Sequence, residues 1–186
     1  MLLIDGLQYC NWSEKIFKEL KLGKVTAIHV TITYHENFRE TVHNIEKWNR
    51  WFEAYPDLIF QGFTAQDITV AQETHRTAVF FGSQNPSCIE DDIGLVEVLH
   101  RLGLRFMQLT YNNQSLLATG CYEACDSGLT RMGRAVVEEM NRVGLVVDMS
   151  HSGNRSTLEA IEHSARPIAI THANPSSWHP ALRNKS

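Results

Sequence analysis

The sequence lacks long apolar runs and blocks of like charge. No stretch approaches the roughly 18 apolar residues that a membrane-spanning helix needs, and no run of about five like charges occurs. The formal net charge is −4 over 186 residues, which is too small to indicate binding to nucleic acid or to an anionic membrane surface. We therefore expect neither a nucleic-acid partner nor a membrane span.

Cysteine is scarce as well. Four cysteines in 186 residues do not make a disulfide scaffold, and the first residues lack the basic and apolar segments of a secretory signal peptide. We therefore expect a reduced, cytoplasmic setting without disulfides. Cys121 and Cys125 form a C-x3-C pair with no second pair, which favours two ordinary thiols over a structural zinc site.

Short apolar runs alternate with longer helical patterns along the chain. The expected strands are 2–4, 25–33, 58–60, 77–81, 104–109, 145–149 and 167–170. The expected helices are 13–22, 36–54, 64–73, 92–102, 130–143 and 156–163, and residues 181–186 should be unstructured. This alternation predicts a parallel sheet, and strands that are apolar nearly throughout are typical of strands buried on both faces.

Two architectures fit this pattern, a doubly wound sheet and a (β/α)8 barrel. No G-x-G-x-x-G follows the first strand, which disfavours a dinucleotide-binding sheet. A closed barrel needs eight strands and about 250 residues. We therefore predict an α/β fold, a TIM barrel truncated to about six β/α units, with residues 1–186 as the N-terminal portion of one barrel domain. Its first and sixth strands would be unpaired edges, so we expect a longer chain or a homo-oligomer.

Two histidines follow neighbouring expected strands. His151 comes two residues after strand 145–149, and His172 two residues after strand 167–170. Because functional groups gather at the carboxyl ends of parallel strands, both imidazoles should point into the same mouth, where neutral histidines are typical zinc ligands. The alternative is a pair of hydrogen-bonded histidines at the rim. Histidines elsewhere, His29 included, are expected at surface or packing positions.

Other polar and aromatic residues follow the same strand ends. Asp148 would orient an imidazole or cap the next loop. Further residues expected around the mouth are Tyr9, Trp12, Gln84, Asn85, Thr110, Tyr111 and Asn112. The segment 112–128 shows no regular pattern, and loops of that length are often functional.

The chain from about Ile4 onwards resembles the membrane (renal) dipeptidase family, peptidase family M19. The resemblance is most specific in GLTRMGRAVVEEMNRVG, in the following DMSH, and in PIAITH, which ends at His172. It implies a barrel of the amidohydrolase type and a zinc-dependent hydrolase of dipeptides or related small amides.

The resemblance also assigns ligands for two zinc ions. The family binds one zinc ion through an H-x-D motif after the first strand, bridges both ions with a Glu, and completes the second site with two His. The two His correspond to His151 and His172. The H-x-D positions are Leu7 and Tyr9, and the bridging Glu is Gln84.

These departures affect the expected metal chemistry. Leucine cannot ligate a metal, tyrosine does so poorly because its pKa is near 10, and glutamine carries no charge. A His that contacts substrate in the family corresponds to Tyr111. The resemblance therefore implies one zinc ion rather than two, or none.

We therefore expect a metallodipeptidase-like hydrolase that cleaves an amide or peptide bond of a dipeptide or similar small molecule with a metal-activated water. Tyr9, Gln84, Tyr111 and Asn112 would bind the substrate. The alternatives are a repurposed barrel with one metal or none that acts on a different small substrate, and a protein that only binds one. The aromatic residues favour a cationic methylated amine as that ligand.

Overall fold

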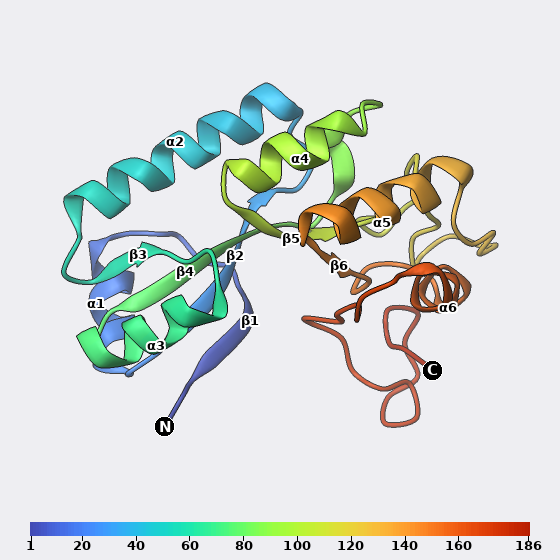
Figure 1. Cartoon of the computed structure of the whole chain (residues 1–186). Coiled ribbons are helices and arrows are strands. Elements are labelled where there is room, and N and C mark those ends of the chain that lie inside the picture. Colours follow the sequence, from blue (N-terminus) through green and yellow to red (C-terminus); the bar gives the residue numbers. More distant parts are fainter.

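Six parallel strands form one curved sheet in the computed structural model, which describes residues 1–186 (Figure 1). The strands are β1 (Ile4–Gln8), β2 (Ala27–Thr33), β3 (Ile59–Gln61), β4 (Thr77–Ser83), β5 (Leu104–Gln108) and β6 (Val146–Asp148). The order is β1-β2-β4-β5-β6. β3 pairs with the first half of β4 and β5 with the second half, so both lie along the same edge of β4. The architecture is a parallel half-barrel, which confirms the predicted fold class.

Helices connect successive strands. They are α1 (Glu14–Leu22), α2 (Phe38–Ala54), α3 (Ala65–Thr74), α4 (Gly94–Arg101), α5 (Arg131–Val143) and α6 (Asn154–His163), with a 3-10 turn η1 (Pro86–Ile89). Thr64 and Asp67 form a capping box at α3, and Gly144 ends α5 with a φ of 87°. None of the helices combines the length and the apolar character that crossing a bilayer requires.

Two of the expected strands differ from the structure. Strand 2–4 was placed too early, because β1 covers Ile4–Gln8 and the polar residues of β1 are held in the sheet by pairing with β2 rather than by their own strand propensity. Strand 167–170 forms only a bridge between Ala169 and Asp148. The sheet still curves strongly, since a Cβ on Gly6 of β1 would lie 2.8 Å from the Thr171 carbonyl oxygen beyond this bridge.

The outer face of the sheet is covered by an apolar core that includes aromatic side chains of α1 and α2. Phe17 and Trp48 are buried and pack against each other at a ring distance of 6.2 Å. Trp12 joins them, with its ring 5.1 Å from that of Trp48, so the expectation that it lines the mouth was wrong. The Trp12 indole packs in the apolar core because α1 and α2 cover that face of the sheet.

The inner face of the half-barrel holds one buried histidine. The Nδ1 atom of His29 donates to the Gly6 carbonyl oxygen at 2.7 Å, and its ring stacks on Phe106 with centroids 4.6 Å apart. A Cβ on Gly82 would lie 1.7 Å from His29 Nε2, so the imidazole fills the space that glycine leaves. His29 is therefore a packing residue, as expected.

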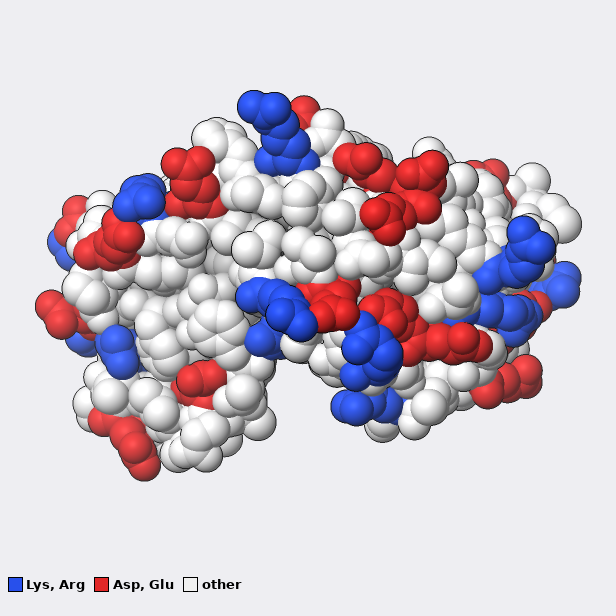
Figure 2. Space-filling model, turned by 45° about the horizontal axis from the view of Figure 1, so that its top comes forward, with Lys and Arg blue, Asp and Glu red and all other residues white.

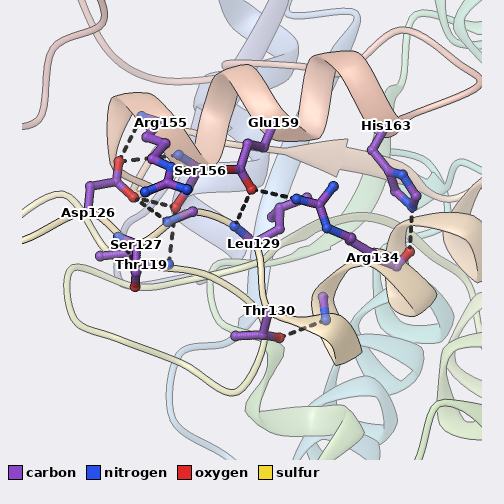
Figure 3. A network of polar contacts seen from close by, with 12 residues as sticks. Thr119, Asp126, Ser127, Leu129, Thr130, Arg134, Arg155, Ser156, Glu159 and His163 are labelled. Atoms are coloured by element: carbon purple, nitrogen blue, oxygen red, sulfur yellow. Dashed lines mark hydrogen bonds and ion pairs between the residues drawn. The ribbon is translucent and has the colours of Figure 1, made fainter.

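A polar network fixes the long segment between β5 and α5 (Figure 3). The Asp126 carboxylate accepts hydrogen bonds from the N–H groups of Arg155 and Ser156, at 2.7 and 3.2 Å, at the start of α6. Glu159 of α6 accepts from the Leu129 N–H at 3.0 Å. Residues 112–128 form a loop, as predicted, and these two carboxylates tie that loop to α6.

Charged side chains are distributed without an extended patch of one sign on the face drawn in Figure 2, where basic and acidic residues lie side by side. Several of them form exposed ion pairs within or between helices, such as Arg142 with Glu97 at 2.5 Å and Arg50 with Glu53 at 2.6 Å. Exposed pairs of this kind contribute little to stability.

Candidate active site

His151 and His172 meet at the carboxyl end of the sheet. His151 follows β6, and His172 follows the bridge at Ala169. Their Nε2 atoms lie 3.0 Å apart. This is close to the separation of two ligand atoms that are each bound to the same zinc ion at about 2 Å.

The hydrogen bonds of the two Nδ1 atoms define the tautomer of each ring. His151 Nδ1 donates to Asn112 Oδ1 at 2.8 Å. His172 Nδ1 lies 2.7 Å from the Thr171 hydroxyl, which itself donates to Asp148 Oδ2 at 2.6 Å, so His172 Nδ1 is the donor to Thr171. Both Nε2 atoms therefore present lone pairs to the space between them.

Asp148 positions His172 from inside the sheet. Its carboxylate is fully buried and also accepts from Gln108 at 3.0 Å and from the Ser150 hydroxyl at 2.6 Å. The same Ser150 oxygen accepts the N–H of His172 at 3.2 Å. Asp148 thus orients an imidazole through Thr171 and also caps the loop after β6.

Gln84 adds a third acceptor to the histidine pair. Its side-chain N–H donates to the Thr31 hydroxyl at 2.8 Å, which turns Gln84 Oε1 towards His151 Nε2 at 3.1 Å. His172 Nε2 and Gln84 Oε1 thus both lie close to His151 Nε2, at 3.0 and 3.1 Å. Imidazole nitrogens and an amide oxygen are atoms that can ligate a cation.

The histidine pair has no acidic or thiol side chain grouped with it as a further ligand. No three His, Cys, Asp or Glu side chains form a group that could hold a metal ion, and the Asp148 carboxylate is engaged within the sheet.

Arg183 is a site residue that the sequence pattern did not indicate. Its Nη2 atom donates to His151 Nε2 and to the His172 carbonyl oxygen, each at 3.1 Å. It lies in the 181–186 stretch that we expected to be unstructured, whereas Lys185 of the same stretch forms a bridge with Pro175. No local sequence pattern distinguishes a single arginine in a polar stretch, and Arg183 comes close to the histidines only when the chain has folded.

Burial and positive charge keep both imidazoles neutral. Burial, followed by the charges of Arg183 and His172, lowers the pKa of His151 to about 3. Burial likewise lowers the pKa of His172 to about 4, although Asp148 acts in the opposite direction. At neutral pH both Nε2 atoms therefore carry a lone pair rather than a proton.

The metal-free protein is expected to lose thermal stability as the pH falls from about 6.5 to about 4. The folded-state pKa values of both histidines lie below the ordinary value of 6.5, so in this interval the unfolded chain takes up protons that the folded chain does not. The melting temperature, measured by scanning calorimetry with a chelator present, should decline through this window. A His151→Asn variant should show a shallower decline, and an unchanged slope would contradict this origin.

A pocket of about 550 Å³ opens beside the histidine pair. The expected substrate-binding residues Tyr9, Gln84, Tyr111 and Asn112 all line it. Tyr34, His35, Tyr122, His151 and Arg183 complete the lining. No aspartate or glutamate is among these residues, so Arg183 carries the only permanent charge of the pocket wall.

Two other residues expected around the mouth lie elsewhere. Asn85 donates to His35 Nδ1 at 3.1 Å and lines a neighbouring pocket. The Thr110 hydroxyl is buried, 2.9 Å from that of Ser152. Asn112 does reach the site because it adopts a φ of 67°, a backbone conformation that asparagine tolerates better than most residues.

The chain is similar to known proteins over nearly its whole length. The family model described as membrane dipeptidase (peptidase family M19) matches residues 15–185. Dipeptidase tcpJ of Claviceps purpurea is 26% identical over 153 residues, which is 81% of this chain and 36% of that protein. Dipeptidase 3 of Rattus norvegicus is 27% identical over 141 residues, 73% of this chain and 28% of that protein. The chain thus spans about a third of the length of these curated relatives.

Solved structures share the fold. An amidohydrolase from Pseudomonas aeruginosa is 39% identical with a TM-score of 0.96, over 99% of this chain and 56% of that one. A metallo peptidase from Rhodobacter sphaeroides, liganded with a phosphinate mimic of the dipeptide L-Ala-D-Ala, has a TM-score of 0.85 at 14% identity, over 99% of this chain and 68% of that one. The second likeness concerns the fold alone.

Proposed function

Because this chain belongs to the membrane dipeptidase family, peptidase family M19, we propose that it hydrolyses an amide or peptide bond of a dipeptide or a similar small molecule. The family is one of metal-dependent hydrolases, and a single metal ion in this chain is supported by His172 Nε2 and Gln84 Oε1, which lie 3.0 and 3.1 Å from His151 Nε2. His151, His172 and Gln84 would hold a zinc ion, which would supply a Lewis acid for the amide carbonyl and an activated water.

The remaining residues of the pocket bind and orient the substrate. The Arg183 guanidinium is the only permanent charge in the pocket wall, and guanidinium groups pair strongly with carboxylates. It would therefore bind a carboxylate at the end of the substrate. Asn112 holds the Nδ1 proton of His151 and so keeps the Nε2 lone pair directed into the site.

A second function is favoured by one contact. Arg183 donates to the Nε2 lone pair of His151, so a cationic group of the protein already interacts with the atom that would bind a metal. A pocket in which this contact persists would bind a small molecule without hydrolysing it.

Metal content separates the two functions. The purified chain would be stripped with a chelator, dialysed against zinc and subjected to elemental analysis, with His172→Ala as the control. We expect about one zinc ion per chain and less than a tenth of that in the control, together with hydrolysis of a simple dipeptide such as Ala-Ala. Zero zinc would support the binding function, and two would contradict the single-metal site.

A further inference from the structure

Three tyrosine rings from three different strand ends meet in the pocket beside the histidine pair. Tyr9 follows β1, Tyr34 follows β2 and Tyr111 follows β5. The rings of Tyr9 and Tyr34 lie 5.6 Å apart at an angle of 82°, and those of Tyr34 and Tyr111 lie 5.6 Å apart at 79°. All three line the same pocket of about 550 Å³, so its wall on this side consists of aromatic rings set nearly at right angles.

The tyrosines are not explained by the packing of the core. Tyr9 is 73% exposed, and neither Tyr34 nor Tyr111 is fully buried. Perpendicular aromatic walls are the arrangement that surrounds methylated ammonium groups, because each ring presents its negative face to the cation. The geometry therefore provides an environment for a cation that cannot donate hydrogen bonds.

The other residues of the pocket distinguish between kinds of cation. A primary ammonium carries three N–H donors and is best paired with a carboxylate, but no aspartate or glutamate lines this pocket. A quaternary ammonium has no N–H group and therefore needs no carboxylate as a hydrogen-bond acceptor. The aromatic wall thus suits a methylated amine better than the free amino terminus of an ordinary dipeptide.

The aromatic wall and the guanidinium both contact the same imidazole. The Tyr111 ring is 4.4 Å from the ring of His151, and Arg183 Nη2 is 3.1 Å from His151 Nε2. A zwitterion with a methylated ammonium at one end and a carboxylate at the other would therefore bring its middle next to the histidine pair.

We propose that the substrates of this site are small amides whose acyl part carries a quaternary ammonium and whose amine part ends in a carboxylate. This inference rests on the proposed function for the reaction itself. In N,N,N-trimethylglycylglycine, hydrolysis would break the amide C–N bond, add the hydroxyl of water to the carbonyl carbon and give the proton to the departing amine. The products are trimethylglycine and glycine, with no change of oxidation state.

Calorimetric titration of the metal-stripped chain tests the ligand class without turnover. The probes are N,N,N-trimethylglycylglycine, glycylglycine and N-(3,3-dimethylbutanoyl)glycine, in which a neutral tert-butyl group replaces the trimethylammonium group at nearly equal size. We expect the quaternary compound to bind at least about tenfold more tightly than either of the others, a difference of about 1.4 kcal/mol that cation–π contacts can supply. Equal binding of the neutral isostere, or no heat with any probe, would overturn the inference.

Two variants of one ring provide the matched control. Tyr34→Phe keeps the aromatic face and should keep the tenfold preference, whereas Tyr34→Leu should reduce it to less than about threefold. A preference that survives Tyr34→Leu would also overturn the inference. The hydrolysis assay is separate: quaternary preference without hydrolysis by the zinc-loaded chain would contradict only the proposed function, and hydrolysis without quaternary preference would contradict only this substrate class.

Discussion

Replacement of His151 by alanine is expected to abolish zinc binding and to lower amide hydrolysis at least about 100-fold. Loss of a residue that merely orients a ligand already lowers metal affinity or activity about 10- to 100-fold, and His151 supplies the lone pair that faces both His172 and Gln84. Zinc affinity would be measured by competition with a chromophoric chelator, and activity with a dipeptide under saturating zinc.

Two further variants define what this result means. Asn112→Ala removes only the acceptor for His151 Nδ1, so we expect a smaller loss of zinc affinity, about 10- to 100-fold. His179→Ala changes an exposed imidazole of the same C-terminal segment and should leave both quantities unchanged. Full activity in the His151→Ala variant would remove the histidine pair from the mechanism.

A large loss of stability is expected from Gly82→Ala. A Cβ at this position would lie 1.7 Å from His29 Nε2 in the buried interior of the half-barrel, and overpacking of a rigid core costs about 3 kcal/mol or more when the neighbour cannot move. His29 cannot turn away easily, because it is hydrogen-bonded to Gly6 and stacked on Phe106. Urea denaturation would show a lower midpoint with an unchanged slope.

A double variant assigns this cost to the imidazole. His29→Ala removes the ring that the new methyl group meets, so the double variant should be less destabilised than the sum of the single changes. Gly144→Ala serves as the control, because its Cβ would have no neighbour closer than 4.0 Å and only its φ of 87° opposes the substitution. We expect about 1 kcal/mol there. Additive effects of Gly82→Ala and His29→Ala would show that the two residues do not share this space.

The alternation of apolar runs and helical patterns was sufficient to predict a parallel sheet, and the family resemblance favoured the barrel over the doubly wound sheet. Local patterns also located His151 and His172, because a histidine just beyond a parallel strand must lie at the carboxyl end of the sheet. The pattern placed β1 too early, because the polar residues of β1 are extended through pairing with β2, and it predicted a strand at 167–170 where only the bridge between Ala169 and Asp148 forms.

The parts of the site that depend on long-range contacts were not predictable. Arg183 reaches His151 across 32 positions of sequence, and no local pattern marks it. Trp12 and Tyr9 both follow β1, yet one enters the core and the other the pocket, because Trp12 packs on Trp48 of α2 whereas Tyr9 lies against Tyr34. Which aromatic residue serves which role is decided only when helix and sheet have packed.

The contacts of Asp126 with the start of α6, and of Glu159 with the Leu129 N–H, have a consequence for ligand binding. The segment that they hold, residues 112–128, also supplies Asn112 and Tyr122 to the pocket wall. We expect this part of the wall to be ordered before a ligand binds, so that binding costs little of its conformational entropy.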